Sequence, residues 1–118
     1  MPNYAVNDAA VAHARKLIDA GTCDTETPWS EAAPATAEGN KEIEREDWDG
    51  YAEWHLALDP SAPEHTKKRY AFPYGDFHEV NRAALVHAKQ RASQNDHREV
   101  EKAAGDLLDR LDTKMGRR

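Results

Sequence analysis

The chain has 118 residues, enough for one domain with a single hydrophobic core. Its net charge is -6 at pH 7, with 39% hydrophobic residues and a mean hydropathy of -0.94, which predicts a lean core that a partner surface completes. No apolar run approaches the length of a membrane helix and no signal peptide is recognised, so we expect no membrane partner. The single cysteine, Cys23, excludes an intramolecular disulfide and is typical of the reducing cytoplasm.

The charge is divided unevenly along the chain. Residues 1–66 hold four basic and fourteen acidic residues, a balance of -10, whereas residues 67–118 hold twelve basic and eight acidic residues, a balance of +4. This asymmetry predicts an acidic and a basic surface on one small body, suited to head-to-tail or two-fold self-association or to nucleic acid on the basic side. The alternative is that the acidic half is simply well solvated.

The N-terminal half is predicted to hold one good helix and a long acidic segment. Apolar residues recur at helical spacing over residues 7–20, and Gly21 then ends the helix. The segment 22–39 is rich in Thr, Glu, Ala and Pro, so we expect a loop with one helical turn after Pro28. The following residues, 41–47, carry so much charge that they predict at best a short exposed helix or turn.

A first strand is predicted over residues 53–58, where apolar residues alternate with His55 and Ala57. A short helix over residues 51–58 is the alternative, because Ala, Glu and Leu favour helices. The connection 59–66 is too long for a tight hairpin, but it fits an antiparallel pair joined by a structured loop.

A second strand is predicted over residues 69–74, where three aromatic residues alternate with smaller ones. This period of two places Tyr70, Phe72 and Tyr74 on one face of an extended segment. Pro73 has no N–H to donate, so the strand lies at a sheet edge or ends there. The rings are interpreted first as core, with a platform for stacked bases as the alternative.

Two helices with clear periodicity follow, joined by a turn at residues 94–96. The first is predicted over residues 77–93 with Asp76 as its cap, and the second runs to Met115 after a capping-box spacing. Gly105 in the second helix predicts that a neighbouring backbone or ring packs close to it. The predicted fold is therefore α+β and mostly helical, with a C-terminal antiparallel helix hairpin packed on a short two-stranded β element, plus an N-terminal helix.

No complete catalytic or metal motif occurs in the sequence. The six histidines include no pair at i, i+4 spacing, and none joins Cys23 in a ligand motif. The chain also lacks a Gly-x-Ser-x-Gly motif and a glycine-rich phosphate loop. We therefore expect no enzyme, no metal site and no cofactor.

Several short patterns in the second half occur together in a known family. They are Asp47-Trp48-Asp49-Gly50, His55-Leu56, Asp59-Pro60, the aromatic run through Gly75-Asp76, Val80-Asn81-Arg82 and Ala88-Lys89-Gln90-Arg91-Ala92. On these patterns residues 48–112 resemble a small uncharacterised domain of actinobacterial prophages and phages, found near or fused to head-maturation protease genes. The resemblance implies phage ancestry and an assembly role, with phage head or assembly proteins as partners. It divides the chain into an N-terminal segment, 1–46, and a core domain, 47–118, within one compact body.

Our hypothesis is that the chain is a phage-derived, non-enzymatic cytoplasmic protein that self-associates, most simply as a homodimer. The lean core, the open strand edge and the alanine-rich helix face all favour such an interface. The predicted interface residues are Tyr70, Phe72, Tyr74, Leu85 and Leu108.

The alternative hypothesis is a nucleic-acid-binding dimer that contacts DNA or RNA through a basic patch on its C-terminal half. The cations that would contact phosphates are Lys67, Lys68, Arg69, Arg82, Lys89, Arg91 and Arg98. Against it stand the acidic balance of the whole chain and the interruption of the patch by Glu79, Glu99 and Glu101. The same cations can instead pair with the acidic half of the chain.

Overall fold

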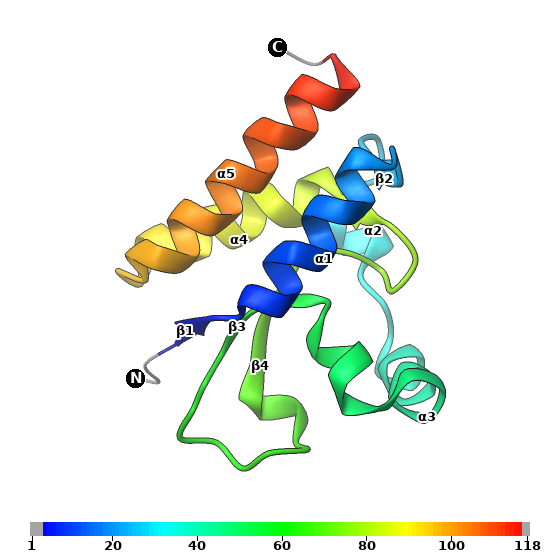
Figure 1. The fold of residues 1–118 in the computed structure, drawn as a ribbon, viewed down its shortest axis with the longest axis vertical. Helices are drawn as coiled ribbons and strands as arrows, with labels where there is room; N and C mark the ends of the chain where they lie inside the picture. The colour runs from blue at the N-terminus through cyan, green and yellow to red at the C-terminus, as the bar shows by residue number, and fades with distance from the viewer. Residues whose placement is uncertain (1–3, 117–118) are drawn as a thin grey trace.

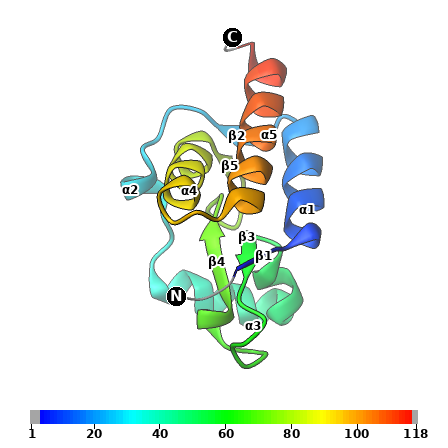
Figure 2. The same ribbon diagram turned by 90° about the vertical axis from the view of Figure 1, so that its left-hand side faces the viewer.

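The computed structural model describes residues 4–116 and confirms the predicted class, a mostly helical α+β fold (Figures 1 and 2). The helices are α1 (Asp8–Asp19), α2 (Trp29–Ala32), α3 (Thr36–Ala52), α4 (Arg82–Gln94) and α5 (Arg98–Met115). The helices α4 and α5 form the predicted antiparallel hairpin, and α1 packs beside α5. The helix α3 lies at the other end of the molecule, away from this hairpin.

The β structure is larger than the predicted two-stranded element. The strands are β1 (Ala5–Val6), β2 (Cys23–Asp24), β3 (His55–Leu58), β4 (Tyr70–Pro73) and β5 (Val80–Asn81). An antiparallel sheet has the order β1-β3-β4, and β2 pairs in parallel with β5 in a second sheet. The predicted antiparallel pair is therefore confirmed as β3 and β4, with β1 added on the far side of β3. The strand β4 ends at Pro73 and forms an edge of its sheet, as the missing N–H predicts.

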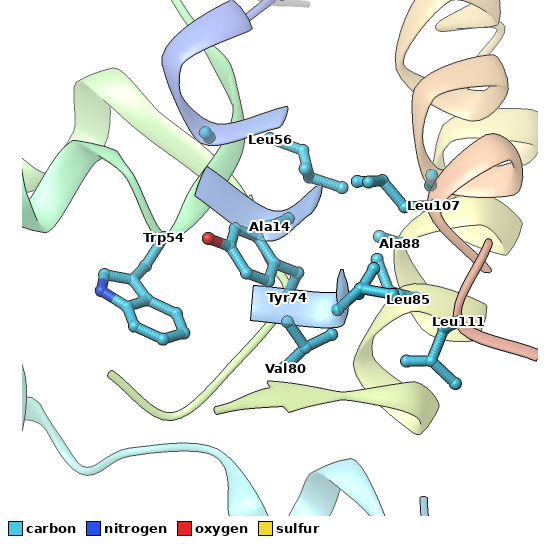
Figure 3. Packing of buried hydrophobic residues seen from close by; sticks show 12 residues of the cluster. Ala14, Trp54, Leu56, Tyr74, Val80, Leu85, Ala88, Leu107 and Leu111 are labelled. Atoms are coloured by element: carbon cyan, nitrogen blue, oxygen red, sulfur yellow. The ribbon is translucent and has the colours of Figure 1, made fainter. Parts of the chain in front are cut away.

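The hydrophobic core lies between α1, the α4–α5 hairpin and the sheet (Figure 3). Its largest fully buried side chains include Ile18, Leu56, Tyr74, Leu85, Leu107 and Leu111. Alanines of α4 and α5 are also buried, which lets the two helices approach closely. At Gly105 a Cβ atom would lie 3.5 Å from Cε of Lys89, so the neighbour is a lysine stem and not the expected backbone or ring.

The helix α4 begins later than its hydrophobic pattern predicts. Its N-cap is Asn81, whose Oδ1 accepts a hydrogen bond from the backbone N–H of Ala84 at 2.8 Å. The expected cap, Asp76, instead accepts bonds from the backbone N–H groups of His78 and Glu79 in the preceding turn. Pairing of β5 with β2 holds the residues just before Arg82 in an extended conformation, and for that reason the helix does not start at residue 77.

The predicted loop is wrong over residues 36–39, and the short helix or turn expected at residues 41–47 is part of the longer helix α3. Few of its residues are apolar, but Gly39, Glu42 and Tyr51 are buried, and the Glu42 carboxylate pairs with Arg45 one turn away. The helix is kinked at Asp47, which has φ 64° and ψ -178°. At the other end of the chain, the N-cap of α5 is His97 and no side chain caps it, so the capping box predicted at Asp96 does not form.

Candidate functional site

A groove of about 430 Å³ lies beside the free edge of β4 and is closed on one side by α4. Residues from five separate parts of the chain line it, and they are Tyr4, Trp29, Ala71, Phe72, Pro73, His87, Ala88, Arg91, Asn95 and His97. All of the aromatic and histidine side chains in this set remain partly open to solvent. We call this set the β4 groove.

The floor of the β4 groove is a set of rings packed edge to face. The Phe72 ring lies 5.5 Å from Tyr4 and 6.0 Å from His97, at interplanar angles of 90° and 82°. Tyr4 and His97 also contact each other, with ring centroids 5.2 Å apart. Such T-shaped contacts fix the rings against one another, so the floor is held in place before any partner binds.

The backbone at Phe72 has φ 61°, a conformation that is rare for a bulky residue. Two residues further on, the backbone N–H of Tyr74 donates to the carbonyl of Trp54, just before β3, at 3.3 Å. Backbone pairing between these two segments therefore continues beyond the distortion. Strained backbone of this kind persists only where the surroundings enforce it, and it concentrates at binding sites.

The three rings of the aromatic run therefore do not share one face, which corrects the period-two expectation. The Phe72 ring enters the β4 groove. The Tyr70 ring contacts Trp48 at 6.3 Å and Tyr51 at 5.9 Å, and the Tyr74 ring stacks on Trp54 at 5.3 Å. The distorted φ at Phe72 interrupts the regular alternation of a strand, so neighbouring rings reach different clusters.

Two of the predicted interface residues, Tyr74 and Leu85, are 0% exposed and belong to the core of the chain. The Tyr74 hydroxyl donates to the Glu53 carbonyl at 2.7 Å and lies 2.8 Å from Nδ1 of His13, and burial raises the pKa of Tyr74 far above its usual value. Leu108 is half-buried against the same core. Of the five predicted interface residues, only Phe72 lines the groove.

The rim of the β4 groove is polar and carries positive charge. His87 and Arg91 lie exposed on α4, and the Asn95 side chain donates to the Arg91 carbonyl at 2.9 Å. No acidic side chain is among the lining residues, and Arg91 alone among them is formally charged at neutral pH. The groove can therefore hold a flat apolar group while Arg91 pairs with a neighbouring anion.

The cations predicted to contact phosphate do not form one band. Lys67, Lys68 and Arg69 make up the short 3-10 helix η1 (Lys67–Arg69), at the end of the molecule away from α4 and α5 (Figures 1 and 2). Arg69 donates to the Ala62 carbonyl at 2.8 Å and Lys67 reaches the Thr36 carbonyl at 3.4 Å. These two cations are thus partly occupied in holding their own loop.

The remaining cations lie on α4 and α5. Arg82 makes a bidentate pair with Asp112 at 2.7 and 3.0 Å, and this hydrogen bonding raises the pKa of the guanidinium. Lys89, Arg91 and Arg98 are exposed. The structure therefore leaves a small exposed group on the helix hairpin in place of the predicted seven-residue patch.

A second surface feature is the kink of α3, which we call the acidic kink and define as residues 46–49. The helix that contains it carries six acidic and two basic residues, a balance of -4. Glu46, Asp47 and Asp49 are exposed around the half-buried Trp48, whose ring stacks on His65 at 6.0 Å and 11°. The acidic kink thus combines three exposed carboxylates with an aromatic ring that its own chain partly covers.

The β4 groove has no local signature in the sequence. Its rings come from residue 4, residue 29, residue 72 and residue 97, and no local pattern connects positions so far apart. The signal that was present is the odd placement of single large rings, Tyr4 and Trp29, in otherwise small or polar segments.

Within residues 4–116, no group of three or more His, Cys, Asp or Glu side chains is arranged to hold a metal ion. In the same range, no helix combines the length and the apolar character needed to cross a bilayer. No protein-family model, curated protein or solved structure matches this chain.

Proposed function

We propose that this chain is a non-catalytic, self-associating interaction protein and that the β4 groove is its binding surface. The observation that carries the proposal is the convergence of half-buried rings from separate segments on one open groove. The other large apolar side chains are mostly closed in the core, and Met115, 40% exposed, is the one exposed large hydrophobic residue in the described part of the chain. Aromatic side chains held in such open pockets are the groups that contribute most to protein interfaces.

The free edge of β4 favours contacts through side chains over a long strand ladder. Pro73 offers no N–H, and the positive φ of Phe72 turns the backbone away from regular pairing. An added strand would therefore gain few backbone hydrogen bonds on this edge. The partner is held mainly by the rings and by Arg91.

An assembly role in a phage-derived system is part of the proposal. It is supported by the resemblance of residues 48–112 to a domain of phages and prophages. A cytoplasmic location is supported by the single cysteine, Cys23, where burial raises the pKa of the thiol and keeps it protonated.

A nucleic-acid-binding function is the second candidate, and the exposed Lys89, Arg91 and Arg98 favour it. The pairing of Arg82 with Asp112 and of Lys102 with Asp106 leaves this candidate with less free positive charge than the sequence suggests. A gel shift with random duplex and single-stranded DNA at low and high salt tests it. Absence of a shift at low salt removes this function.

The test of self-association is sedimentation equilibrium of the chain from about 10 μM to about 1 mM, a range that covers weak interfaces. We expect the mean mass to rise with concentration, and we expect Phe72→Ala to lower the association while circular dichroism shows the fold retained. Met115→Ala is the control, because it removes an exposed apolar side chain outside the groove. A wild-type chain that stays monomeric throughout the range contradicts the proposed function.

A further inference from the structure

We infer that the β4 groove of one copy receives the acidic kink of a second copy, so that the chains associate head to tail. This inference rests on the proposed function and names the partner surface of the same site. Two properties of the groove, its charge and its ring-lined shape, identify the occupant.

The charges of the two surfaces are complementary. The groove is lined by Arg91 and two histidines with no carboxylate among its walls, and the acidic kink exposes Glu46, Asp47 and Asp49. In the sequence, Arg91 lies in the half whose balance is +4, and the acidic kink lies in the half whose balance is -10. Opposite potentials of this kind select one mutual orientation and suppress contact between like surfaces. Two β4 grooves facing each other would instead bring two Arg91 side chains together.

The shape of the acidic kink suits a ring-lined groove. Asp47 interrupts the helix with φ 64°, and the backbone N–H of Trp48 donates to the Asp47 carboxylate at 2.8 Å. The Trp48 indole is half-buried against Tyr51, His65 and Tyr70 of its own chain, and exposed acidic residues precede and follow it in the sequence. A groove of about 430 Å³ has room for part of such a ring against Phe72 and Tyr4, while the flanking carboxylates reach Arg91.

The two surfaces are separate on each chain. Trp48 packs with Tyr51, His65 and Tyr70, and none of these residues lines the β4 groove. The contact between copies is therefore heterologous and leaves a free groove at one end of every pair and a free kink at the other. Such an interface builds open chains or rings, which differs from the two-fold homodimer expected from the sequence.

Charge reversal on each surface, followed by mixing, tests this arrangement. Arg91→Glu changes the groove and Asp49→Lys changes the acidic kink, and both residues are exposed in the single chain. Lys114→Glu and Asp109→Lys are matched controls, since they make the same charge changes at exposed positions of α5 outside both surfaces. Mass distributions are measured by sedimentation velocity for each variant alone and for equimolar mixtures.

We expect each surface variant alone to associate at least about tenfold more weakly than the wild type, and each control to associate like the wild type. In the mixture, Arg91→Glu retains an intact kink and Asp49→Lys retains an intact groove, so one good contact forms. The mixture should therefore recover at least a heterodimer, whereas each variant alone stays largely monomeric at the same concentration.

The possible failures separate the two proposals. A monomeric wild type contradicts the proposed function itself. If the wild type associates and Phe72→Ala weakens this association but Asp49→Lys does not, the groove remains the binding surface and the acidic kink is overturned as its occupant. A mixture that does not recover a heterodimer, or a wild type that stops at a symmetric dimer, also overturns the head-to-tail contact.

Discussion

Two regions of the molecule are stabilised in different ways. The helical region, α1 with the α4–α5 hairpin, buries aliphatic side chains and alanines along its whole length. The ring region, α3 with β3, β4 and the loop 59–69, contains a chain of aromatic contacts through Trp48, Tyr51, His55 and Tyr70. The ring region also buries the carboxylate of Glu42.

The unusual backbone conformations are concentrated in and beside the ring region. Among the non-glycine residues of the described chain with positive φ, four lie between residues 47 and 77, and the fifth, Asp96, is in the turn between α4 and α5. The helical region therefore provides stability, and it allows the other region to hold strained backbone and partly open rings. Both proposed contact surfaces draw on these strained positions, Asp47 and Phe72.

The largest effect is expected for Leu85→Ala, a deletion in the helical region. Leu85 is 0% exposed in the main core, so the substitution should lower the free energy of unfolding by about 3 kcal/mol. Urea denaturation measures the loss, and Leu108→Ala, at a half-buried position, should cost less. If Leu85 were an interface residue, the variant would instead lose association with little loss of stability.

The second prediction concerns the ring region and pH. His55 is 7% exposed, its Nδ1 lies 3.0 Å from the Tyr51 carbonyl, and burial lowers the pKa of its imidazole from 6.5 to about 4. Between pH 6.5 and about 4, the imidazole of His55 binds a proton in the unfolded chain but not in the folded chain. The stability due to this group is therefore complete above pH 6.5 and is lost as pH falls toward 4. The loss amounts to about 3 kcal/mol at the acid end.

The variant His55→Asn keeps a side-chain donor for the Tyr51 carbonyl but does not titrate in this range. Its free energy of unfolding should therefore fall less steeply between pH 7 and pH 4 than that of the wild type. Urea denaturation at a series of pH values between 7 and 4 measures both slopes. Equal slopes for wild type and His55→Asn would show that His55 is not buried as described.

A third prediction compares two glycines, Gly105 in the helical region and Gly75 just beyond the end of β4 in the ring region. At Gly75 a Cβ atom would lie 2.3 Å from the Glu79 carbonyl oxygen and 2.6 Å from the Trp54 ring, so Gly75→Ala should cost about 2 kcal/mol. At Gly105 in α5 the nearest contact would be an ordinary 3.5 Å to Lys89, so Gly105→Ala should stabilise by up to about 1 kcal/mol. Thermal melts of both variants measure the difference, and a neutral Gly75→Ala would contradict the close packing of this turn.

The helical region could be predicted well from sequence, because its information is local. The spacing of apolar residues in α1 and α5 gives both the existence and the buried face of each helix. The predicted start of α4 at residue 77 was wrong because residues 80–81 pair with residues 23–24, and helical periodicity does not encode this contact. Long-range pairing of this kind overrides the local preference of an apolar segment.

The ring region was harder to predict because its burial depends on single residues. The charge of α3 predicts an exposed segment, yet Glu42 and Tyr51 are buried, and the Tyr51 ring contacts His55 and Tyr70 of the sheet. The alternation in the aromatic run correctly predicted the strand β4, but it could not show that Phe72 adopts positive φ and enters a groove with Tyr4 and His97. The candidate site was missed because its rings come from segments far apart in the chain.

The most direct test of the central claim, that this chain associates through the β4 groove and the acidic kink, is a dilution series of ¹⁵N–¹H correlation spectra. We expect the amide signals of Phe72 and Arg91 and the indole signal of Trp48 to shift with concentration along one common binding curve, while core residues such as Leu107 do not. Spectra that do not change with concentration, or shifts at the groove without shifts at Trp48, would contradict the account.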